Sequence, residues 1–309
     1  MHPDDSPKCF HHHLGFWAVE ALWFTQAVQM FRLGLWASQA PEPPVKIEAA
    51  ERRPYDVTTQ GTAIIPLMGP LSKGGSAKFD GTSTVRTRRM LRMAVQDDEV
   101  ANILLHIDSP GGHVAGIEAL AGDVAHIKGR KPIVAHVDDL GASAAYWVAS
   151  QADSIAANAT SEVGSIGTIA VVEDTSGRMD RLGIKVHVIS TGSYKGAGAD
   201  GAPISDATLA YLHDRVHAIN GHFLQAVQRG RRFSGEQVAA VSDGRVHIAG
   251  AAQRLGLIDR VQSLDESLGN LSSSGTLAPA RVRPSRAVAR LAAWQAQHSA
   301  GGGSHASSL

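Results

Sequence analysis

From about residue 58 onward, short apolar runs alternate with stretches in which apolar side chains recur every three or four positions. The runs at 62–69, 102–108 and 132–138 are rich in β-branched residues and predict buried strands. The stretches at 83–97 and 114–129 have helical spacing. Strands and helices that alternate through short connections predict an α/β domain around a largely parallel sheet.

The alternation continues beyond residue 140. Ser205 and Asp206 are cap candidates at the start of one long helix, and Ser143 falls on the turn between a strand and the next helix. Further strands are predicted at 154–158, 167–173 and 185–191, and further helices at 143–152, 176–183, 205–232, 234–241 and 249–256.

The N-terminal stretch 14–36 is long and apolar, but polar residues interrupt it. On a helical projection Trp17, Phe24 and Phe31 share one stripe and Arg32 lies opposite, which predicts an amphipathic helix that docks on protein. Peripheral association with a membrane surface stays open as an alternative, whereas integral membrane insertion and a cleaved signal peptide are disfavoured.

Composition divides the chain into three parts. Residues 1–53 combine the amphipathic helix with a proline-rich linker, residues 54–265 form the α/β domain, and residues 266–309 read as a flexible tail rich in Ser, Ala, Gly and Arg. Lys plus Arg equals Asp plus Glu at 29 each, so no global field favours nucleic acid. The single Cys9 excludes an intramolecular disulfide and fits a cytoplasmic, reducing compartment.

A glycine pair follows the strand predicted at 102–108. In "DSPGGHVAG", Gly111 and Gly112 permit backbone conformations closed to other residues, so consecutive N–H groups can point into a cleft. Such a loop suits an oxyanion. Taken alone, the loop is more simply interpreted as a tight turn that needs glycine only for its geometry.

Two polar residues in later loops could supply a nucleophile and a base. "GASAA" around Ser143 resembles a nucleophile elbow, although a serine hydroxyl needs a base nearby and the residue alone could be a helix cap. Lys195 lies in the glycine-rich loop 190–203, where a solvated lysine is the simplest interpretation. If that loop folds over the sheet, burial favours the neutral amine, which can take a serine proton, and Ser165 could orient it.

The order "DSPGG", "GASAAYWVAS", "VGSIGT", "TGSYKGAG" and "GRVHIAGAAQRLGLID" resembles peptidase family S49, the signal peptide peptidase A type, over roughly residues 58–262. The resemblance implies a ClpP/crotonase-like fold, a Ser/Lys dyad, a protein or peptide substrate and a homo-oligomer. It assigns Ser143 as nucleophile, Lys195 as general base, Ser165 as the serine that contacts the lysine, and Gly112 with Ala144 as oxyanion donors. Gly111 shapes the turn. The mechanism requires no metal or cofactor.

Within this family the soluble form, the amphipathic N-terminal segment and the proline-rich linker look more like the phage and prophage capsid-protease branch. That branch implies scaffold, capsid or portal proteins as partners and a place in the host cytoplasm or the prohead. A signal peptide peptidase, a non-catalytic capsid-assembly protein and an acyl-CoA enzyme of crotonase type remain as alternatives.

The chain contains 15 histidines. The tract at 9–13 lacks a second ligand pair, so no metal site is assigned. His106 and His136 fall within predicted strands and are expected in the core or on a sheet face. His113 follows the glycine pair and could line the substrate cleft.

Overall fold

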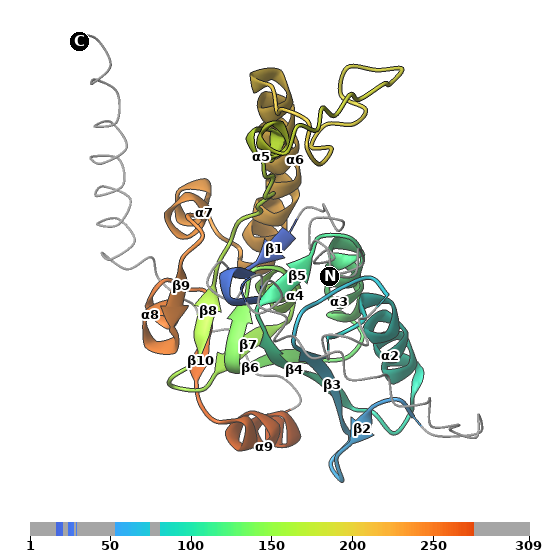
Figure 1. The fold of residues 1–309 in the computed structure, drawn as a ribbon. Helices are drawn as coiled ribbons and strands as arrows, with labels where there is room; N and C mark the ends of the chain where they lie inside the picture. The colour runs from blue at the N-terminus through green and yellow to red at the C-terminus, as the bar shows by residue number, and fades with distance from the viewer. Residues whose placement is uncertain (1–16, 21–23, 28, 30–52, 75–80, 275–309) are drawn as a thin grey trace.

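The computed structural model describes residues 17–20, 24–27, 29, 53–74 and 81–274. Its centre is a twisted sheet in the spatial order β10-β7-β6-β4-β3-β2, in which only β2 runs antiparallel to its neighbour (Figure 1). The α/β prediction with a mostly parallel sheet is confirmed, whereas the ClpP/crotonase-like arrangement stays a prediction. The strands of this path are β2 (Asp56–Val57), β3 (Thr62–Met68), β4 (Asn102–Ser109), β6 (Ile133–Ala142), β7 (Ser154–Ala157) and β10 (Arg260–Val261).

A short extension of the sheet begins beside the end of β6. Strand β8 (Glu162–Gly164) runs parallel to residues 140–142, and β9 (Val246–Ile248) pairs antiparallel with β8. This extension brings residues 164 and 165 next to the carboxyl end of β6, where open α/β sheets place their sites.

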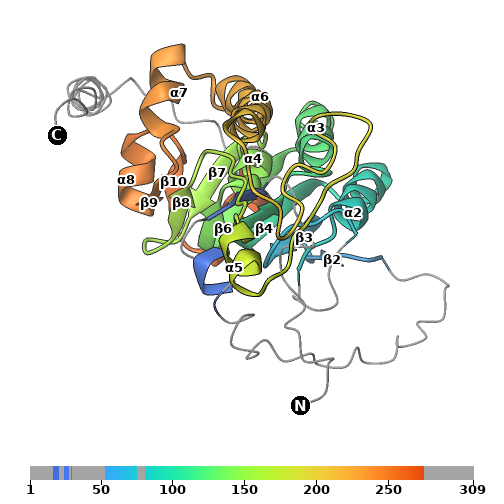
Figure 2. The same ribbon diagram turned by 45° about the horizontal axis from the view of Figure 1, so that its top comes forward.

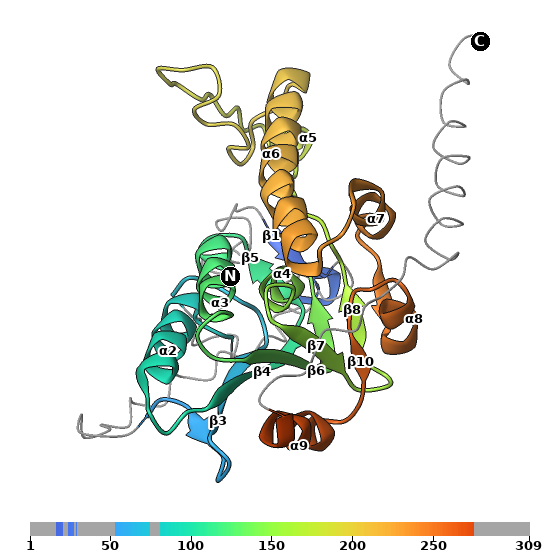
Figure 3. The ribbon, with the colours of Figure 1, turned by 180° about the vertical axis from the view of Figure 1, so that it is seen from behind.

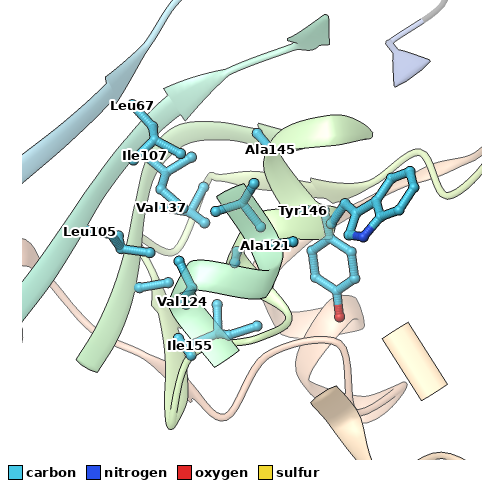
Figure 4. Close-up of a cluster of buried hydrophobic side chains, with 14 of the residues drawn as sticks. Leu67, Leu105, Ile107, Ala121, Val124, Val137, Ala145, Tyr146 and Ile155 are labelled. Carbon is cyan, nitrogen blue, oxygen red and sulfur yellow. The ribbon is translucent and has the colours of Figure 1, made fainter. Parts of the chain in front are cut away.

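The alternation of side chains along the strands divides the core into two layers. Leu67, Leu105 and Val137 face the larger cluster, in which Tyr146 and Val124 also lie (Figure 4). Three helices that the sequence predicted cover this face, and Figure 2 shows them side by side along the sheet. They are α2 (Thr84–Gln96), α3 (Ile117–Ile127) and α4 (Ala144–Ala149).

Helix α9 (Leu264–Ser274) covers the opposite face of the sheet, as the back view shows (Figure 3). Leu271 packs on Leu104 and Val134, whose side chains alternate with those of the larger cluster. Helix α9 therefore extends the folded domain past the predicted boundary at residue 265.

Helix α6 (Asp206–Arg231) begins at the predicted cap, where the Ser205 hydroxyl accepts a hydrogen bond from the Thr208 N–H at 3.2 Å. Its second half enters the core, and Phe223 stacks on Trp147 of α4 with the rings 4.7 Å apart. Its first half projects from the sheet (Figures 1 and 3). The remaining helices near it are α5 (Ser176–Arg181), α7 (Gly235–Val241) and α8 (Ala249–Arg254).

The strands predicted at 167–173 and 185–191 do not form. Only Ile169 makes a β-bridge, and 185–191 has no regular structure. We call residues 170–205 the arm; it includes α5 and projects with the first half of α6 (Figure 1). These apolar runs lack a neighbouring strand in the single chain, which explains why β-rich composition gives no strand there.

The prediction of a helix over 14–36 is wrong near its start. Residues Trp17–Val19 form strand β1, which pairs antiparallel with β5 (Gly111–His113), while residues 24–27 are helical. Residues 17–19 form a strand in spite of their helical pattern because hydrogen bonds to β5 on one side and to Ile169 on the other stabilise the extended backbone. Much of the predicted helix and the His tract at 9–13 lie outside the described residues. Within the described ranges, no helix combines the length and the apolar character needed to span a membrane.

Candidate active site

Ser143 stands where β6 ends and α4 begins. Its φ of 55° and ψ of −118° are unusual for a residue with a side chain. The turn is held by the Ser143 N–H, which donates to the Gly164 carbonyl at 2.8 Å, and by the Ser143 carbonyl, which accepts from the Trp147 N–H at 2.9 Å. Strained backbone of this kind clusters at functional sites. The predicted strand-to-helix turn is confirmed.

The Ser143 side chain does not cap α4. Its hydroxyl makes no cap hydrogen bond, and among the described residues the buried Oγ has no hydrogen-bond partner. Buried polar atoms nearly always have one, so an orphaned hydroxyl in a strained turn needs a reason beyond folding. This argues against the interpretation of Ser143 as a simple helix cap.

The glycine pair lies directly against this turn. A Cβ on Gly111, whose φ is +95°, would stand 2.9 Å from Ser143 Cβ and 2.8 Å from the Ala144 nitrogen. A Cβ on Gly112 would lie 2.1 Å from the Leu71 carbonyl oxygen. Both positions therefore require glycine, and the structure brings Gly111, Gly112, Ser143 and Ala144 together.

Two hydrogen bonds fix the glycine strand from its far edge. The Leu71 N–H donates to the Gly111 carbonyl at 2.8 Å, and the His113 N–H donates to the Leu71 carbonyl at 2.9 Å. Below the turn, the Ser109 hydroxyl donates to the Gly69 carbonyl at 2.6 Å and accepts from the Gly111 N–H at 3.2 Å. These bonds rigidify the backbone that the oxyanion prediction invokes.

Ser165 lies beside the same turn. It follows Gly164, the residue that binds Ser143 through its carbonyl, and its own N–H donates to the Arg245 carbonyl at 2.7 Å. Its φ is 51° and its side chain is almost fully buried. The structure thus brings Ser165 to Ser143.

Lys195 is not brought to the other five positions. It is exposed in the arm, where the ring of its neighbour Tyr194 stacks on Tyr211 in the first half of α6, with the ring centroids 4.8 Å apart. A single copy of the chain in this arrangement does not assemble the predicted dyad.

Next to Ser143, two backbone segments lie one strand apart, and we call the space between them the groove. Strand β5 offers one edge and Ile169 the other, and β1 lies between them. Trp17 exchanges both backbone hydrogen bonds with Ile169, at 3.0 Å and 2.8 Å. Sequence reasoning missed this groove because its two edges come from residues more than 50 positions apart.

The histidines occupy different places. His113 lies in β5, where its ring meets the Trp17 ring edge-on at 5.2 Å; its place in a substrate cleft stays a prediction. His106 Nε2 lies 3.3 Å from Asp138 Oδ2. His136 is fully buried under α9, with Nδ1 2.8 Å from the Ser267 hydroxyl, and burial lowers its pKa to about 4.

Across the described parts of the chain, no three His, Cys, Asp or Glu side chains gather in a way that could hold a metal ion. The described neighbours of Ser143 include the Gly111 position, the Ala144 nitrogen and the Gly164 carbonyl. Such an arrangement can hold an extended peptide, present a serine to one of its carbonyls and stabilise a developing oxyanion.

Residues 125–276 match peptidase family S49. The match covers 152 of the 309 residues, so the chain is similar to this family over just under half of its length. The matched range contains Ser143, Ser165 and Lys195, and the glycine pair lies just before it. The resemblance inferred from the motifs is confirmed at the level of the family.

Three relatives illustrate the range of the family. A protein of Methanocaldococcus jannaschii that carries a protease name is 35% identical over 57% of each chain. The capsid assembly protease C of Escherichia phage lambda is 30% identical over 66% of this chain and 48% of its own length. The head-tail preconnector protein of Enterobacteria phage P21 is 29% identical over 74% of this chain and 48% of its own. The chain spans about half the length of these relatives.

Proposed function

We propose that this protein is a serine peptidase in which Ser143 is the nucleophile. The observation that carries the proposal is the buried, unpartnered Ser143 hydroxyl on a strained turn, next to a glycine pair that leaves backbone amides free of side chains. Names of proteases among the relatives support the same reaction class.

The reaction would proceed by acyl transfer. A base removes the Ser143 proton while Oγ attacks a peptide carbonyl, and the N–H groups of Gly112 and Ala144 stabilise the oxyanion. The C–N bond breaks, the base returns the proton to the amine, and water then hydrolyses the ester. Lys195 is the proposed base, with Ser165 orienting its amine and Gly111 shaping the turn.

A second copy of the chain is the simplest source of that lysine. Lys195 is exposed on the arm, and the arm and the start of α6 carry large apolar side chains open to solvent, with Ile189 97% exposed. Large apolar side chains that lie exposed together are typical of surfaces that bind another protein chain. The others are Val171, Leu182, Ile184, Val188, Tyr194 and Leu209.

The test is hydrolysis of a mixed peptide library at pH 8, read by mass spectrometry. Ser143→Ala and Lys195→Ala should each abolish cleavage. Ser154→Ala is the matched control, because Ser154 Oγ is also buried and unpartnered but lies in β7. Activity that survives Ser143→Ala, or that is lost equally in Ser154→Ala, contradicts the proposal.

For the biological substrate we favour capsid or scaffold proteins during phage head assembly. The two phage relatives cover 66% and 74% of this chain. The alternative is a signal peptide peptidase, since a protein with that name in Enterococcus faecium is 26% identical over 62% of the chain. Incubating the peptidase with each substrate class and comparing kcat/KM separates the two.

A further inference from the structure

Strand β1 occupies the space that a peptide substrate would need. Its residues pair antiparallel with β5 in the register Trp17 to His113, Ala18 to Gly112 and Val19 to Gly111. On its other side Trp17 is bonded to Ile169. Neighbouring strands lie about 4.8 Å apart, so two edges separated by one strand accept one extended chain.

The carbonyl of Ala18 points at the reactive turn. Since Trp17 directs both its N–H and its carbonyl to Ile169, the pleat turns those of Ala18 the other way, toward β5. The point where a Gly111 Cβ would stand lies 2.3 Å from the Ala18 oxygen, 2.8 Å from the Ala144 nitrogen and 2.9 Å from Ser143 Cβ. The Ala18 carbonyl oxygen therefore lies within a few ångströms of Ser143, the proposed nucleophile, and of the Ala144 nitrogen, a proposed oxyanion donor.

The contacts made by β1 and by the residue after it are those expected of a bound peptide. Ala18 is completely buried, so only a small residue fits at this position. Trp17 packs on His113 and, at 5.9 Å, on the Phe24 ring. Next along the chain, the Glu20 N–H donates to the Pro110 carbonyl at 2.7 Å.

The segment also closes the site. Ser143 and Ala144 are 0% exposed in the presence of β1. A nucleophile that acts on another chain must be reachable, so β1 has to leave before any external peptide can bind.

We propose that Trp17–Val19 is a built-in substrate segment, which blocks the groove until Ser143 cleaves the bond between Ala18 and Val19. This inference rests on the proposed function and adds to it the substrate class: an extended peptide with a small residue before the cut. Ser143 Oγ forms an ester with the Ala18 carbonyl carbon, the Ala18–Val19 C–N bond breaks, and the proton removed from Oγ passes to the Val19 amine. Water then releases residues 1–18 as a free acid.

The first experiment measures the intact mass and the N-terminal sequence of the purified full-length chain during incubation at pH 8. Val19 should appear as a new N-terminus in the wild type and in Ser154→Ala, and not in Ser143→Ala. Val19→Pro should also prevent this cut, because the tertiary amide of proline is a poor fit to the site, while leaving Ser143 in place.

A second measurement tests whether β1 occupies the groove, and it does not require catalysis. In the Ser143→Ala background, Ala18→Glu places a charge in the buried position and should expel β1, which speeds hydrogen exchange of the β5 amides. Gln26→Glu adds the same charge to an exposed residue of the helical stretch 24–27, outside β1, and should change nothing.

The outcomes separate the two proposals. A wild type that cleaves library peptides but keeps the 18–19 bond, with exchange at β5 unaffected by Ala18→Glu, overturns the built-in substrate and leaves the peptidase standing. A wild type that cleaves neither peptides nor itself overturns the peptidase and the self-cleavage together.

Discussion

Gly112 shows how closely backbone segments approach at the site. Its missing side chain lets the Leu71 carbonyl pass within 2.1 Å of where a Cβ would stand. We expect Gly112→Ala to displace β5, misalign the oxyanion donors and lower kcat by about 10²-fold or more.

The matched control for this substitution is Gly122→Ala. Gly122 lies within α3 and has open space around its Cβ position. The exchange should leave kcat unchanged and raise stability by about 0.5–1 kcal/mol. Peptide-cleavage kinetics and urea unfolding of both variants measure the contrast, and equal losses of activity would contradict a special role of Gly112.

His136 makes stability depend on pH. Burial lowers its pKa from the usual 6.5 to about 4. Between these values the unfolded chain binds a proton that the folded chain does not, so stability falls as pH decreases from 6.5 toward 4, by up to about 1.4 kcal/mol per pH unit. Above pH 6.5 this contribution is constant.

Urea unfolding at pH 7 and pH 5 tests this expectation. His136→Gln removes the titrating group and should reduce the difference in unfolding free energy between the two pH values by about 1–2 kcal/mol. An undiminished difference would assign the pH dependence to other groups.

The elements that local signals determine were predictable. Ser205, a predicted cap, accepts a hydrogen bond at the start of α6. Strand β1 was not predictable, because Trp17–Val19 carries a helical pattern and its partners lie about 95 and 150 positions away in sequence. The predicted strands at 167–173 and 185–191 failed for the converse reason, since the described chain provides no partner strands there.

An ion pair joins the end of α6 to the sheet. Arg231 binds Asp259 in a bidentate pair at 2.8 and 2.9 Å, both side chains are more than 90% buried, and Asp259 also accepts from the Ile155 N–H. Asp259→Asn leaves the buried guanidinium without its counter-charge and should destabilise the protein by about 3–5 kcal/mol.

The double variant Arg231→Met with Asp259→Asn should regain part of this loss, because no uncompensated charge remains. Thermal unfolding of the two single variants and the double variant forms the cycle. Additive losses would show that the pair does not act as a unit.

At the scale of the whole molecule, the separation of Lys195 from Ser143 predicts complementation. Neither Ser143→Ala nor Lys195→Ala should cleave peptides alone. Co-expressed in equal amounts and assembled at random, they should give about a quarter of wild-type activity, because a site built from two copies then pairs an intact serine with an intact lysine in one case out of four.

Size-exclusion chromatography of the co-expressed sample accompanies the assay. Mixed assemblies without activity would mean that both residues come from one chain, with the arm folded back. The sequence motifs name the residues of the proposed site, but they carry no information on which copy of the chain supplies each residue.

The single-strand width of the groove between β5 and Ile169 also determines what can enter it. A helix or a strand already paired in a sheet cannot present free backbone to both edges, so a protein substrate must first unfold locally. The rate of cleavage then follows the population of the locally open form. If the proposed peptidase function holds, the rate of cleavage therefore reports the local stability of the substrate: a segment that unfolds often is cut quickly, and a segment that becomes stably folded is not cut.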